Sequence, residues 1–309
     1  MTAPDPSLPA SAPARVRWRG RIRWLILISG SIGLALITRQ ALTADEQPVP
    51  SPAMGAMAFV LYLGAGVAAA RAWSVLLGPA VDPVEVRGAM YASQLSKYVP
   101  GGGVLQAAGQ MTLSTSDQLT MRRSALSWAT SMVLTVVAGG ALLSAFAVVG
   151  GFSGWVRAGA LLGALGLLAV DRRRLAWVLT RARRVTTRIP EPDLLPEQRA
   201  LVIGLQWTTA SVLLSAASYT AILVDLDGAV RPVEVLPAFV AAWLAGFLLV
   251  PLPAGLGARE AILVALLPGS TTGLLLSASV VQRVLAIGAE VSLVLGHRVA
   301  SRRRRRDGG

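Results

Sequence analysis

A helix-breaking stretch interrupts an apolar region of the chain, with the sequence Lys97-Tyr98-Val99-Pro100-Gly101-Gly102-Gly103. Proline followed by glycines disfavours a continuous helix. Lys97 is the only lysine of the chain, because every other basic residue is arginine. A compact ammonium group beside a broken helix suits the binding of an anion within a membrane protein. The stretch therefore favours transport or lipid handling over soluble chemistry.

The composition is that of a membrane protein. Of the 309 residues, 54% are hydrophobic and 15% are charged, whereas soluble domains carry about 25% charged residues. The mean hydropathy is +0.59, and several apolar runs reach the roughly 20 residues that a helix needs to cross a bilayer. The sequence therefore predicts an all-α, polytopic transmembrane helical bundle.

Several classes of site are disfavoured by composition. The chain has no cysteine and one histidine, which excludes thiol catalysis and disfavours the usual zinc clusters. We therefore expect no metal, no cofactor and no catalytic residue. The net charge of +13 does not indicate a nucleic-acid partner, because the arginines lie beside apolar segments, where they set topology and attract anionic lipid headgroups.

Charge divides the loops between the two sides of a membrane. Arginines concentrate in segments 15–23, 171–199 and 301–306, whereas loops 43–53 and 225–234 are mainly acidic. The positive-inside rule then places both termini and the 171–199 loop in the cytoplasm of a bacterial-type plasma membrane. Six full spans fit this orientation, at residues 24–42, 54–78, 124–149, 155–170, 201–224 and 271–296.

The same division predicts the domain organisation. Residues 1–20 are expected to be a disordered basic segment and residues 21–300 one integral membrane domain, with a basic cytoplasmic loop at 171–200. Residues 301–309 form an Arg-rich tail.

Two further segments, 84–118 and 235–268, carry helix breaks near their middle, at 100–103 and 251–257. The topology requires each to be a re-entrant hairpin, the first entering from the cytoplasm and the second from outside. Two opposed broken hairpins are typical of an inverted-repeat transporter with its site at the breaks. Alternatively, residues 235–250 and 258–268 cross as ordinary helices.

Polar side chains form stripes along the first hairpin. Arg87, Tyr91, Gln94 and Tyr98 share one helical face of its first arm, and Gln106, Gln110 and Ser114 share a face of the second. Non-helical backbone at membrane depth occurs only against protein or a watery cavity. These stripes are therefore expected to line such a cavity.

Two motifs resemble those of a known family. The stretches SKYVPGGGVLQAAGQ (96–110) and LPAGLGAREAILVALL (252–267) are similar to the signature regions of the lysylphosphatidylglycerol synthetase membrane-region family, also called flippase-like. In the second, Pro253, Gly255, Gly257, Arg259 and Glu260 fit the family pattern. The first has Val-Leu-Gln after the glycines where the commoner form has Gly-Glu followed by Arg. The resemblance implies an all-helical inner-membrane fold and lipid translocation, without the soluble aminoacyl-transferase domain of the best-known members.

Five charged residues are candidates for function. Lys97, together with the free N–H groups of the helix expected to begin at Val104, suits a phosphate; alternatively it snorkels to the interface. Arg259 and Glu260 open a helix after the second break and bind a ligand anion or form a structural pair. Arg283 and Glu290 lie seven residues apart within the last span, where they hold helices together or bind a headgroup and a proton, respectively.

The leading hypothesis is a translocase or transporter, not an enzyme, for an anionic lipid or lipid-linked saccharide. The alternatives are an intramembrane transferase that uses a lipid-phosphate sugar donor, with Asp45, Glu46, Asp225 and Asp227 as candidate bases, and a non-transporting partner of cell-envelope biosynthesis proteins. The candidate substrate-binding residues are Lys97, Tyr98, Pro100, Gly101, Gly102, Gly103, Gln106, Gln110, Pro253, Gly255, Gly257, Arg259, Glu260, Arg283 and Glu290.

Overall fold

The computed structural model describes residues 49–79, 81–98, 102–113, 121–150, 163, 166, 170–184, 191–248 and 258–307. All regular elements in these residues are helical. Four helices are long and apolar enough to cross a membrane: α2 (Pro52–Leu77), α5 (Met121–Gly150), α8 (Gln198–Leu226) and α11 (Thr272–Asp307). They coincide with four of the six expected spans. Of the other two, 24–42 lies outside the described residues, as does almost all of 155–170.

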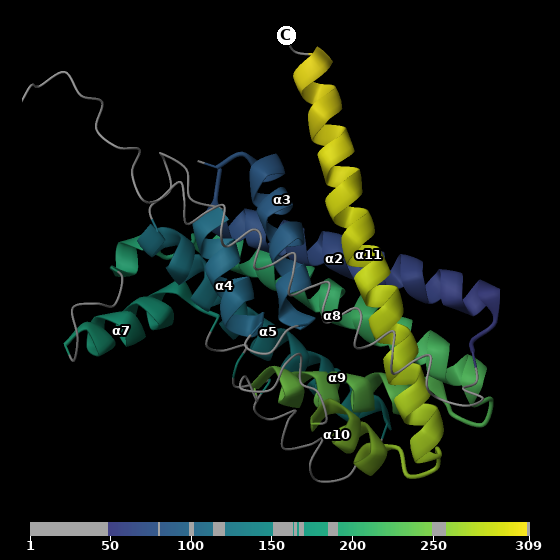
Figure 1. The fold of residues 1–309 in the computed structure, drawn as a ribbon. Coiled ribbons are helices and arrows are strands. Elements are labelled where there is room, and N and C mark those ends of the chain that lie inside the picture. Colours follow the sequence, from purple (N-terminus) through teal and green to yellow (C-terminus); the bar gives the residue numbers. More distant parts are fainter. Residues whose placement is uncertain are drawn as a thin grey trace, which may run out of the picture.

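The shorter elements lie between these helices in the chain (Figure 1). They are α3 (Pro83–Gln94), the 3-10 turn η1 (Leu95–Tyr98), α4 (Gly102–Leu113), α7 (Arg172–Arg183), η2 (Pro192–Leu194), α9 (Pro232–Leu248) and α10 (Ala258–Leu266).

Helices α2 and α8 form the most extensive helix pair. The buried side of α2 consists largely of alanines, which lets the two backbones approach closely. Ser211 and Ser218 of α8 donate hydrogen bonds of 2.9 and 2.8 Å to the carbonyl oxygens of Ala65 and Ala58. As the α8 residue number rises the α2 number falls, so the two helices are antiparallel.

Local signals set several helix ends. Gly78 ends α2 with a φ of +81°, a left-handed conformation that glycine adopts without strain. Asp82 then caps α3, because its side chain accepts a 2.8 Å hydrogen bond from the amide of Val84, and Pro83 occupies the first helical turn. The Thr271 hydroxyl accepts from the Leu274 amide at the start of α11.

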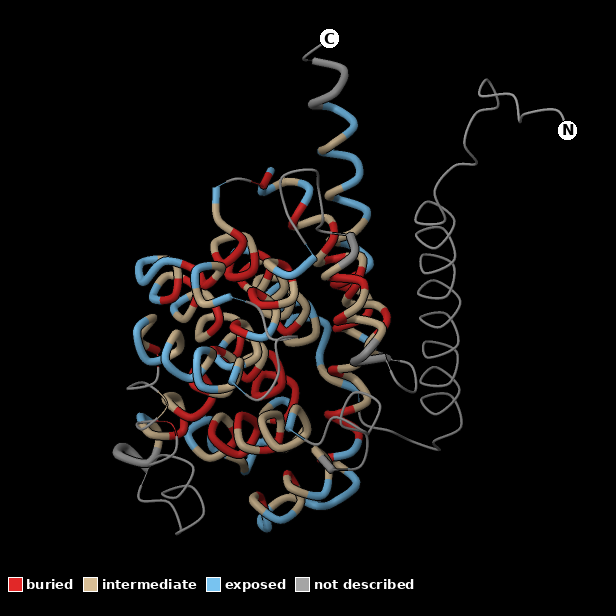
Figure 2. Tube along the Cα trace, turned by 90° about the vertical axis from the view of Figure 1, so that its left-hand side faces the viewer, coloured by how far each residue is buried: buried red, intermediate tan, exposed pale blue. Residues whose placement is uncertain are grey.

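Helix α11 packs against α2, α8, α3 and α10. In Figure 1 it runs across α2 and α8, and its C-terminal end stands clear of the other helices. Figure 2 shows that burial follows this path, with exposed residues along the projecting end. At 36 residues, the helix is about 54 Å long, so one element reaches from the α9–α10 region past α3.

The contacts between helix ends show which ends lie together on each of two sides of the helical bundle. On one side, Leu76 near the end of α2 packs with Leu201 near the start of α8, and Gly78 lies beside Arg123 at the start of α5. On the other, Asp225 near the end of α8 accepts hydrogen bonds from the amide and hydroxyl of Ser51, which precedes α2, at 2.5 and 3.0 Å.

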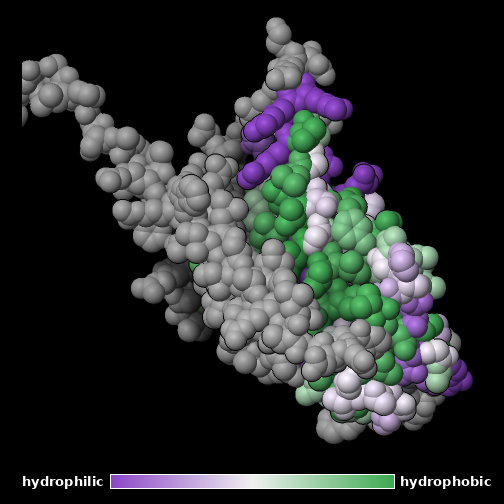
Figure 3. All heavy atoms as spheres, turned by 45° about the vertical axis from the view of Figure 1, so that its right-hand side comes forward, coloured by the Kyte–Doolittle hydropathy of each residue, from purple (hydrophilic) through white to green (hydrophobic). Residues whose placement is uncertain are grey.

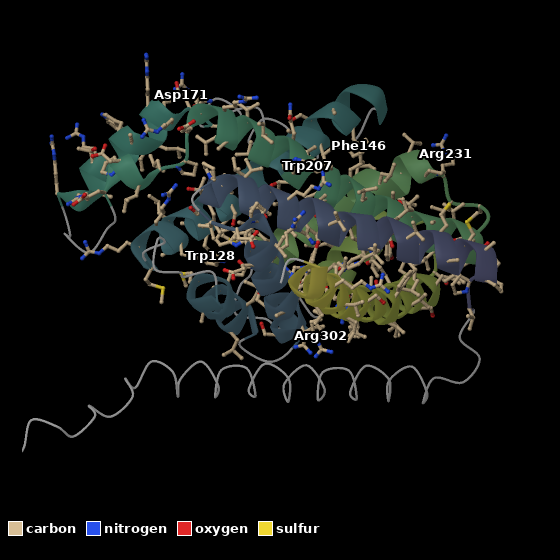
Figure 4. The ribbon with its side chains drawn as sticks, turned by 90° about the horizontal axis from the view of Figure 1, so that it is seen from above. Trp128, Phe146, Asp171, Trp207, Arg231 and Arg302 are labelled. Carbon is tan, nitrogen blue, oxygen red and sulfur yellow. The ribbon has the colours of Figure 1, made fainter. Side chains whose placement is uncertain are left out.

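Charge differs between these two sides. The side of Leu76 carries Arg122, Arg123 and Arg199 at the starts of α5 and α8, and the arginines of α7. The side of Ser51 carries Asp225, Asp227 and Glu234, with Arg231. Figure 4 shows Asp171, which precedes α7, and Arg231 at opposite ends of the molecule. We call them the basic side and the acidic side.

The two broken segments each form a pair of packed helices. In the first, α3 packs against α4; α3 follows the basic end of α2, and α4 is followed in the chain by α5, which starts on the basic side. In the second, α9 packs against α10, with α9 following the acidic end of α8. One expectation is corrected here: α4 begins at Gly102, not at Val104, so Gly102 and Gly103 belong to the helix. Glycine is compatible with a helix as well as with a break, so glycines alone do not fix where the helix starts.

A hydrophobic core joins α8, α9, α10 and α11. It is centred on Tyr219 and Phe239, whose ring centroids are 5.1 Å apart. The Tyr219 hydroxyl donates a 3.3 Å hydrogen bond to the carbonyl of Leu275, which satisfies its polar atom inside the core.

The outer face of α11 is apolar. Its large exposed residues recur at helical spacing and are Leu276, Val284, Val291, Leu295 and Val299. Figure 3 shows hydrophobic surface along this part of the molecule and hydrophilic surface at the C-terminal end of the helix. An apolar face of this kind is what a spanning helix presents to lipid.

Paired glycine substitutions test the packing of α5. A Cβ added to Gly163 would overlap the backbone of Gly140 in α5, whereas one added to Gly55 in α2 would meet nothing within 4 Å. We expect Gly163→Ala to destabilise the protein by about 1–3 kcal/mol through overpacking. Gly55→Ala should be neutral or slightly stabilising, since alanine within a helix is more favourable than glycine by roughly 0.5–1 kcal/mol. Thermal unfolding in detergent measures both, and equal effects would contradict the packing described.

Candidate functional site

Lys97 forms an ion pair with Glu290 of α11. The Lys97 ammonium donates to Glu290 Oε1, to Gln94 Oε1 at 3.1 Å and to the Tyr62 hydroxyl at 3.4 Å. The Tyr62 hydroxyl in turn donates to Glu290 Oε1 at 3.3 Å. The side chains of Lys97 and Glu290 are 24% and 5% exposed. Lys97 thus reaches inward to the bundle, and the snorkelling alternative is not what the structure shows.

Glu260 of α10 forms a second ion pair with Arg283 of α11. The guanidinium donates to Glu260 Oε1 at 2.5 Å, and both side chains are nearly buried, at 12% and 13% exposed. Removing charged groups from water is costly unless they are paired. The pair therefore fixes the start of α10, directly after the second break, to the middle of α11.

Arg259 has a different environment from the other cations. Its guanidinium lies 4.5 Å from the ring centroid of Phe239 and 5.6 Å from that of Tyr219, and it donates to the side-chain oxygen of Gln282. The Gln282 amide nitrogen is itself held by the carbonyl of Ser215 at 3.0 Å. Nε of Arg259 is buried and makes no hydrogen bond, and the guanidinium forms no ion pair within the described residues.

These contacts form one polar seam along α11. We define the polar seam as Gln282, Arg283 and Glu290 with their partners Lys97, Arg259 and Glu260. Seven residues separate Arg283 from Glu290, which places them on one face about 10 Å apart along the axis. Tyr62 lies at the Lys97–Glu290 end of the seam.

The seam carries an excess of positive charge. Three cations, Lys97, Arg259 and Arg283, face two carboxylates, Glu260 and Glu290, so the described residues of the seam sum to +1 when all are ionised. Two cations are matched by carboxylates, and Arg259 rests against aromatic rings and an amide. A buried cation without an anionic partner is costly, which makes this position a suitable acceptor for an anion.

Arg283 and Glu290 do not pair with each other. Each instead binds a residue from a different broken segment, which holds α11 to those segments. Since they lie two helical turns apart, their side chains cannot meet while α11 stays helical. The expectation that charges this deep face the bundle is confirmed by their burial.

The polar stripes of the first hairpin pack against protein. Gln110 is buried and its amide contacts the Met90 sulfur at 2.9 Å, between the two arms. Tyr91 is also buried and meets the ring of His297 edge-on, with centroids 5.9 Å apart. Gln106 lies on α4, partly buried. These positions join helices, and no cavity along them is found in the described residues.

Several expected site residues lie outside what the structure describes. They are Pro100, Gly101, Pro253, Gly255 and Gly257, together with the side chain of Tyr98.

Other residues of the site were missed by sequence reasoning. Tyr62, Gln282, Tyr219 and Phe239 all contact the charged groups. Gln282 had a usable signal, because an amide beside Arg283 within an apolar span needs a partner. The aromatic residues had no such sequence signal, since aromatic side chains are common in membrane spans whether or not they contact a charged group.

One pocket is found away from the seam. It has a volume of about 330 Å³ and lies on the acidic side between α9 and the α10–α11 turn, lined by residues that include Glu234, Pro237, Leu266 and Ser270. It contains none of the seam residues.

A double-mutant cycle tests the Lys97–Glu290 pair. Lys97→Met and Glu290→Gln should each lower the free energy of unfolding by roughly 3–5 kcal/mol, because each leaves an uncompensated buried charge. The double variant should lose clearly less than the sum, measured by denaturation in detergent. The exposed pair Arg231–Glu234, with side chains 73% and 40% exposed, is the control and should couple by about 0–1 kcal/mol. Additive losses at Lys97 and Glu290 would contradict a direct interaction.

Comparisons with protein-family models and with curated proteins find no match. The geometry of the seam is therefore the basis on which a function can be argued.

Proposed function

We propose that the protein is a translocase or transporter for an anionic lipid or a lipid-linked saccharide, and that a phosphate-bearing headgroup binds along the polar seam. The observation that carries the proposal is the excess positive charge of the seam, centred on Arg259. Guanidinium groups suit phosphate because their N–H donors match two of its oxygens.

The two ion pairs suggest how a headgroup enters. In the conformation described, Lys97 is paired with Glu290 and Arg283 is paired with Glu260. An incoming phosphate at Arg259 competes with these carboxylates for the neighbouring cations. Exchange of an internal carboxylate for a ligand anion would free a helix contact with α11, which links binding to movement of a hairpin.

The helix pairs α3–α4 and α9–α10 are proposed to be re-entrant hairpins from opposite sides. The α3–α4 pair lies in the chain between the end of α2 and the start of α5, which are both on the basic side. The α9–α10 pair follows the end of α8, on the acidic side, and precedes α11. Their inner ends, Lys97 and Arg259, both contact α11. This arrangement is the one expected of an inverted-repeat transporter.

The orientation proposed for the protein places the basic side in the cytoplasm of a plasma membrane, with both termini there. The resemblance to the lysylphosphatidylglycerol synthetase membrane-region family, which rests on segments 96–110 and 252–267, supports the same class of function.

No specific contact favours the alternative functions. Asp225 accepts two hydrogen bonds from Ser51, and Asp227 accepts one from the Ala229 amide. These roles at helix ends account for both carboxylates without catalysis. Asp45 and Glu46 lie outside the described residues.

A headgroup-accessibility assay tests the proposed function. The protein is reconstituted into vesicles that contain trace fluorescent phosphatidylglycerol, phosphatidylcholine or a polyprenyl-phosphate sugar, and a membrane-impermeant quencher reports transfer between leaflets. We expect transfer of at least one phosphate-bearing anionic probe above empty vesicles. Arg259→Gln should reduce its apparent affinity by about 10- to 100-fold, the range that corresponds to 1.5–3 kcal/mol for a charge-assisted hydrogen bond.

Arg231→Gln is the matched control, since it removes one exposed arginine outside the seam, and it should leave transfer unchanged. Thermal unfolding of both variants separates a binding defect from misfolding. Equal transfer by the wild type, by folded Arg259→Gln and by empty vesicles would reject the proposal.

Single cysteines test the hairpins directly, because the chain has none of its own. Exposed positions Glu85 and Met121 flank the first hairpin, and Gly228 and Gly269 flank the second. An impermeant maleimide applied to intact cells should label Gly228→Cys and Gly269→Cys, and should label Glu85→Cys and Met121→Cys only after permeabilisation. If either segment crosses completely, its two flanking positions will label from opposite sides.

A further inference from the structure

Helix α7 is amphipathic, strongly basic and largely uncovered. Its sequence RRRLAWVLTRAR contains five arginines and no acidic residue, and none of its residues is buried. Leu175, Val178, Leu179 and Ala182 share one face by their spacing, whereas Arg173, Arg174, Thr180 and Arg181 lie around the other. Of the apolar face, Leu175, Leu179 and Ala182 are partly buried, but Val178 remains 53% exposed. Trp177, on the basic face, is 63% exposed.

Specific contacts hold α7 in place at both ends. The Gln198 side chain, at the start of α8, accepts from the Arg172 amide at 2.8 Å and donates to the Val170 carbonyl at 3.0 Å. Asp171 caps the helix through the Arg173 amide. At the other end, Arg183 lies 3.6 Å from Glu191, which precedes η2. The helix is therefore a fixed part of the fold.

These contacts place α7 beside the starting point of an apolar span. Leu175 packs against the cluster of Leu76, Leu134, Val170 and Leu201, and α8 becomes apolar after Arg199. In Figure 4 the nitrogen-tipped side chains around α7 project away from the other helices. Leu175 thus faces the bundle, whereas Val178 of the same apolar face stays exposed near the ends of α2 and α8 where Leu76 and Leu201 lie.

The local charges favour an external anionic surface. Arg172–Arg174 occupy the first turn, where cations oppose the positive end of the helix dipole. Arg181 lies over the ring of Trp177, with 5.5 Å between the guanidinium carbon and the ring centroid. The two side chains therefore form a cation–π contact on the exposed surface of α7. Tryptophan and arginine together are the usual residues of the membrane–water interface.

We propose that α7 is an interfacial helix that binds the surface of the membrane through its anionic lipid headgroups, with Val178 inserted at the acyl boundary. The exposed arginines supply attraction to the negative surface, and Val178 supplies insertion. This surface is separate from the polar seam and requires no transport activity. Its occupant is a lipid surface, not a protein, because a basic helix fixed beside the ends of two spans faces headgroups.

Site-directed spin labelling of the full-length protein tests this interface. Labels at Val178→Cys and Thr180→Cys are compared in vesicles of phosphatidylcholine alone and of phosphatidylcholine with about a third phosphatidylglycerol. In the anionic vesicles, the ratio of oxygen to nickel-chelate collision rates at Val178→Cys should exceed that at Thr180→Cys severalfold. In neutral vesicles the ratio at Val178→Cys should fall towards that of Thr180→Cys.

Charge-neutralising variants separate the contribution of α7 from general surface charge. Arg173→Gln with Arg181→Gln should abolish the dependence on anionic lipid, whereas Arg302→Gln with Arg303→Gln, which removes two exposed arginines from the end of α11, should retain it. The proposal is overturned if the Val178→Cys label is as water-accessible as Thr180→Cys in anionic vesicles. It is equally overturned if the two lipid compositions, or the two double variants, give the same result.

Discussion

Charged groups on one otherwise apolar helix are the constraint on which the rest of the structure depends. Arg283 and Glu290 lie within α11, which presents an apolar face outward, so both must find partners inside the bundle. Neither can satisfy the other across two helical turns. Their partners come from the inner ends of two broken segments, Glu260 from α10 and Lys97 from η1. The need to neutralise α11 thus determines where both helix pairs dock.

The remaining packing supports that docking without adding charge. Helices α2 and α8 approach through alanine and through serine hydroxyls bonded to facing carbonyls, which leaves Tyr62 of α2 free to reach the Lys97–Glu290 pair. On the other side, Tyr219 and Phe239 provide the aromatic surface on which Arg259 rests. Small residues and aromatic rings therefore have distinct roles. Small residues bring helices together, and aromatic rings hold the Arg259 guanidinium, which forms no ion pair within the described part of the chain.

The sequence predicted more of the fold than of the site. Apolar length was enough to place α2, α5, α8 and the start of α11 within a few residues, because a bilayer sets the length of a span. The end of α11 was not placed, since the helix continues past the expected end at 296 to Asp307. The ends of α3–η1 and α9 before the two breaks also agree with the sequence, since proline followed by glycines disfavours a continuous helix. Gly102 was assigned wrongly because glycine permits a helix as well as a break.

The partner of each charge was not predictable, because Lys97 and Glu290 are 193 residues apart and nothing in the local pattern of either indicates the other. Spacing placed Arg283 and Glu290 on one face correctly, but a shared face does not imply a mutual contact.

The continuity of α11 has a mechanical consequence. Gln282, Arg283 and Glu290 belong to one unbroken helix, so they move as a rigid lever. A rotation of that lever about its axis by a single residue step, about 100°, turns all three side chains away from their partners at once. The contacts with the two helix pairs cannot be released one at a time by such a rotation. Independent release requires a tilt of α11 about a pivot between Arg283 and Glu290.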